Sequence, residues 1–496
     1  MSRYTTAPCG REDKDNKRGK AAAASDKAAG KGKGKGKDAA PETLNIWDRS
    51  KPEEREEIEL YARDYMDFLT EAKTERKAYS LVLGHLEKEG FTDLANGGKI
   101  GRGGYLGHFG KLLGAYAPGR LSPAGGFNLI VAHGDSPRLD LKPRCVYEEG
   151  SLALLKSNMY GGLKKFQWLA RPVALWGFAA LKDGRAVDFR FGEDPAGPVL
   201  TITDILPHLD RKVQRDKRLV DAFPAEKLNV LAASVPCGER ESKHRLKQAV
   251  FKILEDRWGL KEEDLISSEI EIVPAGPAVP VGLDGSFIGG YGQDDRLSVY
   301  AMLRAFLAVE KPERPLILLL VDREEIGSRG ATAAATRFVE RLAALALESA
   351  GVEPGYRAVL DSLARSHAVS ADVEAGVDPT FKEVSDEMNS AKVTFGPAVV
   401  RYTGGAAKYG ASEAGAEYMA KIRAVYDGDG VIWQSSLLGK QEEGGGGTVA
   451  MNFADFGMGV VDSGAPVLSM HSPFEISSKA DVWMTYRAYR AFYRDA

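Results

Sequence analysis

The stretch FNLIVAHGDSP at residues 127–137 predicts the centre of the fold, because a continuous apolar run ends there in polar residues. Residues 127–132 have the length and composition of a fully buried β-strand. A second apolar run, RPLILLLV at residues 314–321, ends in the same way before Asp322. We therefore expect two buried strands, with His133 and Asp322 at their carboxyl ends.

Helical patterns alternate with these strands. Apolar residues recur at helical spacing within residues 53–89, and again from Asp294 to about residue 306. The Ala-rich residues 330–349 are also expected to be helical. Strands that alternate with helices favour an α/β fold with helices on both faces of the sheet.

Residues 145–280 have a different pattern, in which short apolar runs are separated by Gly, Pro and Asp. The runs occupy residues 172–178, 187–191, 199–202 and 269–273. Short runs bounded by turn residues are typical of β-strands. We expect a β-rich domain inserted between residues 43–144 and 281–496, which together would form the α/β domain.

The first 42 residues contain a Gly-Lys repeat and almost no large apolar side chains after Tyr4. Such a segment cannot bury enough apolar surface to offset the entropy lost on ordering. We expect a disordered, solvated tail, although a Gly-Lys repeat could also contact anionic surfaces.

The overall composition is that of a soluble globular protein. Hydrophobic residues make up 44% of the chain and charged residues 28%, with a net charge of −3. This balance gives no reason to expect a nucleic-acid or membrane partner. No apolar segment predicts a membrane span or a signal peptide. Cys9, Cys145 and Cys237 form no close pair, so we expect reduced thiols in a cytoplasmic protein.

Side chains that bind metals concentrate at the predicted strand ends and at one helix start. The clusters are His133-Gly-Asp135, Asp294-Asp295, Glu324-Glu325, Ser370-Ala-Asp372 and Met470-His471. Ligands gather at the carboxyl ends of strands in α/β sheets, so these groups should converge. Zinc accepts imidazole nitrogens and carboxylate oxygens. Two ions ~3.5–4 Å apart would need one carboxylate to bridge them.

Each cluster also has an ordinary structural explanation. The His133 segment could be a surface turn, the two Asp residues could cap a helix, the two Glu residues could be solvated, and His471 could be a packed histidine. The combination is what favours a catalytic metal site. Within the Glu pair, one residue can bind metal while its neighbour takes a proton from water.

In this order the clusters resemble the aspartyl aminopeptidase and vacuolar aminopeptidase I family of dinuclear zinc peptidases. The resemblance extends from about residue 50 to the C-terminus. It implies a zinc-peptidase-type mixed sheet sandwiched by helices, formed by a catalytic domain in two parts and interrupted by a dimerisation domain at residues 145–280. It also implies a zinc-dependent aminopeptidase that removes the N-terminal residue of peptides.

The same resemblance implies a set of metal ligands for two zinc ions per chain. The implied ligands are His133, Asp294, Glu325, Asp372 and His471. Asp294 would bridge the ions, with one His and one carboxylate completing each. Cobalt or manganese could replace zinc, because similar nitrogen and oxygen sites bind several divalent metals.

Three further residues receive catalytic roles from the resemblance. Glu324 would be the general base for a metal-activated water, and Asp135 would orient the His133 ring. The segment Pro207-His208-Leu209 resembles one that places a histidine in the active site of a neighbouring subunit, where it would stabilise the oxyanion. We therefore expect a homo-oligomer, at least a dimer, and the family suggests a dodecamer.

Two positions depart from the family members that prefer acidic residues. Phe395 stands where they have Lys before Gly396-Pro397, and residues 442–448 read EEGGGGT in place of an Asp-Thr-Pro-Cys-Gly-Thr-like loop. The preferred N-terminal residue is therefore open. Two other functions also remain open: another two-metal hydrolase, such as a deacylase or carboxypeptidase, and a non-catalytic zinc-containing assembly protein. The presence of Glu324 argues against the last.

Overall fold

The apolar run at residues 127–132 forms β4 (Asn128–His133), which lies inside a nine-stranded sheet. Its neighbours are β14 (Leu316–Val321) and β15 (His367–Ser370), both parallel to it. β21 (Gly459–Gly464) continues this parallel group beyond β15. The carboxyl ends of these strands therefore meet at one edge of the sheet, as the prediction requires.

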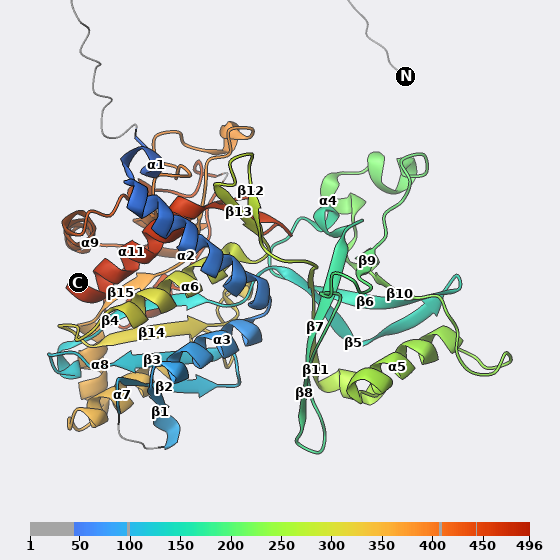
Figure 1. Cartoon of the computed structure of the whole chain (residues 1–496), viewed down its shortest axis with the longest axis horizontal. Helices are drawn as coiled ribbons and strands as arrows, with labels where there is room; N and C mark the ends of the chain where they lie inside the picture. Colours follow the sequence, from blue (N-terminus) through green and yellow to red (C-terminus); the bar gives the residue numbers. More distant parts are fainter. Residues whose placement is uncertain (1–43, 97–99, 406–408, 443) are drawn as a thin grey trace, which may run out of the picture. The chain divides into compact units, whose positions relative to one another are not determined.

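The rest of the nine-stranded sheet makes it mixed, since β3 pairs antiparallel with β14 and β17 pairs antiparallel with β21. Its order is β1-β2-β3-β14-β4-β15-β21-β17-β20. The outer strands are β1 (Phe91–Asp93), β2 (Gly103–His108), β3 (Leu112–Ala117), β17 (Ala398–Val400) and β20 (Gln434–Ser436). The predicted α/β fold with a mixed sheet is confirmed (Figure 1).

The computed structural model describes residues 44–96, 100–405, 409–442 and 444–496. The predicted tail, residues 1–42, lies outside the described residues, as does Glu443 of the Gly-rich loop. None of the helices within the described ranges is long and apolar enough to cross a membrane. The cytoplasmic location stays a prediction.

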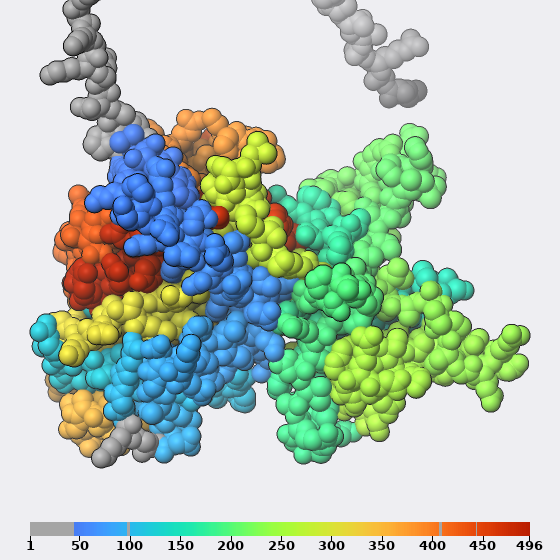
Figure 2. All heavy atoms as spheres, in the orientation of Figure 1, coloured from blue at the N-terminus to red at the C-terminus, as the bar shows by residue number. Residues whose placement is uncertain are grey.

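The two faces of the sheet are covered by different helices, because successive side chains of a strand point to opposite faces. In β14, Leu318 and Leu320 join one buried apolar cluster, whereas Ile317 and Leu319 join a second. Helices on the first face are α2 (Pro52–Glu71), α3 (Glu75–Lys88), α6 (Gln293–Ala308), α9 (Ala416–Gly428) and α11 (Lys479–Asp495); those on the second are α7 (Phe338–Ser349), α8 (Tyr356–Ala364) and α10 (Ala450–Ala454). In Figure 2, α2, α6 and α11 form adjoining blue, yellow and red surfaces.

The predicted β-rich segment forms a seven-stranded sheet in the order β11-β5-β6-β10-β9-β7-β8. Its strands are β5 (Arg138–Glu149), β6 (Leu152–Tyr160), β7 (Pro172–Ala180), β8 (Ala186–Phe191), β9 (Leu200–Ile202), β10 (Val230–Ala233) and β11 (Ser268–Pro274), with α5 (Arg245–Trp258) packed against β5, β6 and β10. This sheet has its own apolar cluster. Its role as a dimerisation domain stays a prediction.

The remaining elements are short. A five-stranded sheet has the order β12-β13-β23-β22-β16, and β18 pairs antiparallel with β19. The bounds are α1 (Ile46–Arg49), α4 (Leu219–Ala222), β12 (Val279–Val281), β13 (Phe287–Gly290), β16 (Glu374–Ala375), β18 (Tyr402–Gly405), β19 (Tyr409–Glu413), β22 (Pro466–Leu468) and β23 (Glu475–Ser478).

One helix is shorter than the sequence pattern predicts. The helical segment expected at residues 330–349 begins only at Phe338, as α7. Residues before it are tied to the end of β14, where the Thr332 hydroxyl donates to the Asp322 carboxylate at 2.6 Å and Ala333 bridges to the Asp322 backbone. These contacts with the end of the preceding strand override the high helix propensity of alanine.

Candidate metal centre

The five predicted ligands come from five separate places in the chain. His133 is the last residue of β4, and Asp372 follows β15 by two residues. Glu325 lies in a short 3₁₀ turn, η8 (Glu324–Ile326), just after β14. Asp294 lies at the start of α6, and His471 follows β22. In the folded chain these residues come together at one edge of the nine-stranded sheet.

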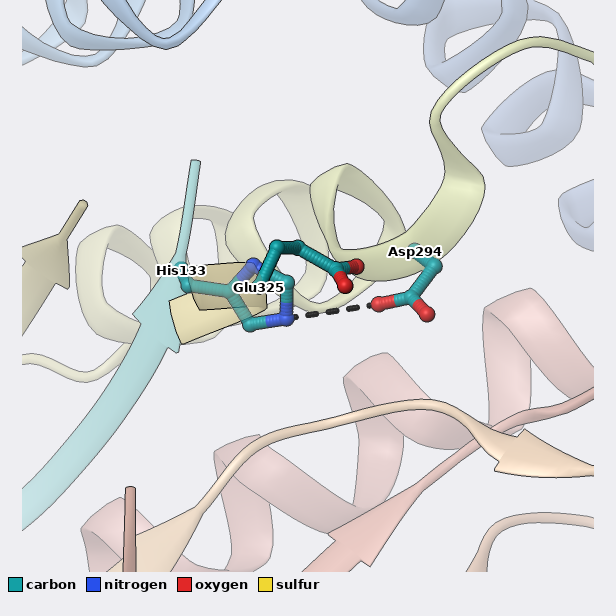
Figure 3. A group of neighbouring side chains, drawn as sticks. All are labelled: His133, Asp294 and Glu325. Carbon is teal, nitrogen blue, oxygen red and sulfur yellow. Dashed lines mark ion pairs between the residues drawn. The ribbon is translucent and has the colours of Figure 1, made fainter. Parts of the chain in front are cut away.

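Asp294 lies between the two histidines. Its Oδ1 is 3.3 Å from His133 Nε2, and its Oδ2 is 3.1 Å from His471 Nε2. Figure 3 shows the His133 and Asp294 side chains pointing toward one another, with Glu325 beside them. One buried carboxylate therefore faces two imidazoles, one with each oxygen.

The α6 start is not an ordinary helix start. Asp294 and Asp295 both have non-helical backbone angles, and the peptide bond between them is cis. The Asp294 side chain is directed at the histidines rather than at the backbone N–H groups of the first turn. A simple capping role for Asp294, the ordinary explanation, does not fit this geometry.

The other two predicted ligands lie around this core. Glu325 Oε1 is 3.5 Å from His471 Nε2, and Asp372 Oδ1 is 3.8 Å from His133 Nε2. Two overlapping groups have ligand atoms within 4.8 Å of one another: one joins His133, Asp294 and Glu325, and the other joins His133, Asp295 and Asp372. Asp295 was not among the ligands predicted from the sequence.

Several oxygens of the cluster are buried without a hydrogen-bond partner among the described residues. They are Asp294 Oδ1, Asp295 Oδ1 and Glu325 Oε1. Buried polar atoms are almost always satisfied, and a buried carboxylate is costly unless it is paired or binds a metal. The donor set of imidazoles and carboxylates with unpartnered oxygens fits a divalent cation.

The electrostatics of the cluster reflect burial of many acids around two histidines. Burial raises the pKa of Glu325 and of Asp372 above the usual range. Burial would also raise the pKa of Asp294, but the adjacent His133 and His471 imidazoles outweigh it and hold that pKa below the usual range. The carboxylates in turn raise the pKa of His471 to about 10, against the opposing effect of burial.

Glu324 lies next to the predicted ligand Glu325 but has a different environment. Burial raises the pKa of the Glu324 carboxyl to about 8; His133 opposes this shift, and the carboxylates of Asp372, Asp135 and Asp294 add to it. Its place next to Glu325, beside the other predicted ligands, suits the base role predicted for Glu324.

Asp135 lies in the cluster but contacts it differently from the prediction. The closest acceptor to His133 Nδ1 is the Asp135 backbone oxygen at 3.0 Å, and the carboxylate is 3.5 Å away. The carboxylate accepts the backbone N–H groups of Glu324 and Glu325, each at 3.2 Å. The Asp135 side chain therefore holds the Glu324-Glu325 turn, while its backbone orients the His133 ring.

The sequence analysis missed a buried carboxylate, Glu475, at the start of β23. Its two oxygens accept the backbone N–H of His471 at 2.7 Å and that of Asp294 at 3.2 Å. Only 1% of Glu475 is exposed. An acid four residues after His471 was the only sequence signal, and it said nothing about contact with Asp294.

His208 lies apart from this cluster. It is exposed in a turn after β9, and among the described residues no hydrogen bond or ion pair joins it to the five predicted ligands. Phe395 is partly buried in the segment before β17. Because His208 lies apart from the predicted ligands, its predicted role in the active site would have to be filled by His208 of a second chain.

A mixed sheet with converging imidazoles and carboxylates at its strand ends defines a metallohydrolase of the α/β class. The chain belongs to the aminopeptidase I zinc metalloprotease family (M18), whose model matches residues 68–493. The predicted family and the predicted class of enzyme, a metallo-aminopeptidase, are both confirmed.

Relatives and solved structures agree with this assignment over most of the chain. A probable M18 family aminopeptidase 1 from Thermotoga maritima is 41% identical over 454 residues, which cover 91% of this chain and 98% of the relative. The crystal structure of an M18 aminopeptidase from the same organism has a TM-score of 0.87 at 41% identity and covers 91% and 99% of the two chains. The S. cerevisiae mApe1 dodecamer has the same fold, with a TM-score of 0.71 at 18% identity and coverage of 89% and 97%.

Proposed function

We propose that this chain removes the N-terminal residue of peptides with the help of two zinc ions. The observation that carries the proposal is the position of Asp294, whose two carboxylate oxygens face different imidazoles at 3.3 and 3.1 Å. A carboxylate in this position suits a bridging ligand in a two-metal site. The unpartnered, buried oxygens of Asp294 and Glu325 support it, because a cation would satisfy both.

The other ligands would divide between the two ions. His133 and Asp372 would complete one set with Asp294, and Glu325 and His471 would complete the other. The distances of 3.8 Å and 3.5 Å within these pairs support the division. Zinc bound there would lower the pKa of water and polarise the peptide carbonyl. Cobalt or manganese would serve as substitutes.

The protein supplies the proton transfers. Glu324 accepts a proton from the attacking water and returns it to the nitrogen of the leaving peptide. The Asp135 carboxylate fixes the backbone of this residue through the N–H of Glu324 at 3.2 Å. A base held in this way is already oriented when the substrate arrives, which lowers the cost of reaching the transition state.

His208 completes the site from a neighbouring subunit in this proposal. Its segment is flanked by exposed apolar side chains: Leu206 is 55% exposed and Leu209 is 70% exposed. Exposed apolar side chains that cluster on a surface are typical of protein contacts. A homo-oligomer, a dimer or a larger assembly such as the yeast dodecamer, would cover them and bring His208 to the oxyanion of the partner site.

Initial rates on a panel of aminoacyl amides, with defined metals added, test this function. Each amide is offered with a free and with an acetylated N-terminus. An aminopeptidase cleaves only the free form, and the panel identifies the preferred residue. Release of acetate from the acetylated form would indicate a deacylase. Release of the C-terminal residue from peptides would indicate a carboxypeptidase. Metal binding without hydrolysis would favour an assembly protein.

A further inference from the structure

The end of strand β6, in the seven-stranded sheet, reaches the metal centre of the nine-stranded sheet. The backbone oxygen of Gly162 accepts a hydrogen bond from His471 Nδ1 at 2.8 Å. Because a carbonyl oxygen can only accept, Nδ1 carries the proton and Nε2 is left to face Asp294. Two residues earlier, the Tyr160 hydroxyl donates to Asp135 Oδ2 at 2.8 Å.

The close approach of this strand end is visible at Gly161. It has a positive φ of 74°, and a Cβ added there would lie 3.3 Å from Glu325 Cβ and 3.2 Å from Pro137 Cα. A larger residue would therefore be strained and would press on a predicted ligand. The segment 160–162 thus contacts the cluster at two places: Gly162 accepts from His471, and Tyr160 donates to Asp135.

Tyr160 contacts the Asp135 carboxylate, which also holds the Glu324-Glu325 turn. Asp135 is fully buried. Its Oδ1 accepts the N–H of Glu324, and its Oδ2 accepts both the N–H of Glu325 and the Tyr160 hydroxyl. A buried carboxylate needs several donors to remain ionised, and each donor also restricts how the carboxylate can turn.

Tyr160 is itself held in place. The Arg138 guanidinium lies 3.9 Å from the centre of the tyrosine ring. Arg138 is 5% exposed and forms ion pairs with Asp140 at 2.8 Å and Glu271 at 3.1 Å. Burial raises the pKa of the Tyr160 hydroxyl far above its usual range, so this group stays protonated and donates.

We propose that Tyr160 is a positioning residue for the metal centre. Its hydroxyl orients the Asp135 carboxylate toward the N–H groups of Glu324 and Glu325, and so places the base and a ligand together. This inference rests on the proposed function, since it assigns the purpose of the contact to that site. It also means that the inserted sheet contributes to the active site of its own chain, independently of His208.

The test is Tyr160→Phe, which keeps the ring over Arg138 and removes only the hydroxyl. The zinc affinity of the metal-free protein, measured by competition with a chromophoric chelator, should fall about 10-fold, and kcat should fall about 10-fold with KM nearly unchanged, as for other outer contacts of metal sites. Tyr147→Phe, on the neighbouring strand β5, is the matched control and should change neither value. Circular dichroism and the melting temperature of the metal-free proteins check that both variants fold.

A double variant separates positioning from a general structural effect. If Tyr160 acts through Asp135, adding Tyr160→Phe to Asp135→Ala should cause little further loss, because the alanine has no oxygen to accept from the hydroxyl. Fully additive losses, or wild-type zinc affinity and kcat in Tyr160→Phe, would overturn the inference. If the wild-type protein itself neither binds two ions nor cleaves free-amino substrates, the proposed function fails instead, and the two failures are distinguished.

Discussion

At the scale of single residues, the two neighbouring glutamates have different surroundings. Glu325 Oε1 is 3.5 Å from His471 Nε2 and has no hydrogen-bond partner among the described residues, whereas the backbone N–H of Glu324 is held by Asp135 at 3.2 Å. Both backbones are held by one carboxylate, Asp135. Adjacent residues on one rigid turn can therefore have separate tasks, one as ligand and one as base.

Replacement of Glu324 tests this separation. Glu324→Gln should lower kcat at least ~100-fold, because a general base is lost, while the two metal ions stay bound. Steady-state kinetics and metal analysis of the dialysed protein measure the two effects. Glu56→Gln, an exposed position on α2, serves as the control and should match the wild type. Loss of zinc from Glu324→Gln would show that the two glutamates have been assigned the wrong way round.

The bridging role proposed for Asp294 predicts the number of metal ions per chain. The wild-type protein should bind about two zinc ions per chain, and Asp294→Asn should lower the affinity for both, because its oxygens face both histidines. Chelator treatment should abolish activity and lower the melting temperature, since ligands that bind only the folded state stabilise it. One ion per chain in fully active protein, measured by mass spectrometry of the metal, would contradict a shared carboxylate.

At the scale of elements, the strands that carry the site depend on apolar packing on both faces of the sheet. Leu318 of β14 is fully buried among the helices of one face. Leu318→Ala should lower the free energy of unfolding by about 2–5 kcal/mol, because it removes buried methyl groups and leaves a cavity. Urea denaturation of the metal-free protein measures the change.

The control for this change lies on α2. Leu60 is 52% exposed, so Leu60→Ala should change the free energy of unfolding by no more than about 0.5 kcal/mol. Equal effects of the two substitutions would mean that β14 does not depend on the packing described for it.

At the scale of the whole molecule, the proposed completion of the active site by the partner's His208 would make activity depend on assembly. His208→Ala and Glu324→Gln subunits should each be inactive. Mixed under conditions of subunit exchange, they should recover activity, because a mixed pair contains one site with an intact Glu324 and the partner's intact His208. Activity assays before and after mixing, with native mass spectrometry to follow exchange, decide this.

A second histidine of the inserted segment provides the control for that experiment. His244 is exposed and lies before α5, so His244→Ala should leave activity unchanged. If exchange is demonstrated and activity does not return on mixing, His208 has no role in trans and is an ordinary surface histidine.

The sequence by itself determined the main strands and the family. The apolar runs that became β4 and β14 are local signals, because burial on both faces favours a nearly continuous run of apolar residues. The clusters of candidate metal ligands could also be recognised in the sequence, since each occupies only a few consecutive residues. The start of α7 could not be predicted from the sequence, because the contact of Thr332 with Asp322 competes with the local helical preference.

Only the tertiary structure decided how the cluster is held together. Glu475 holds Asp294 across 181 residues of sequence, and Asp135 holds Glu324 across 189. Tyr160 reaches Asp135 from a strand of a different sheet. Such hydrogen bonds leave no periodic pattern in the sequence, because any buried carboxylate can accept from whichever backbone N–H the fold brings to it. The clusters that contain the predicted ligands are therefore local in sequence, whereas the orientation of these side chains is a property of the folded chain.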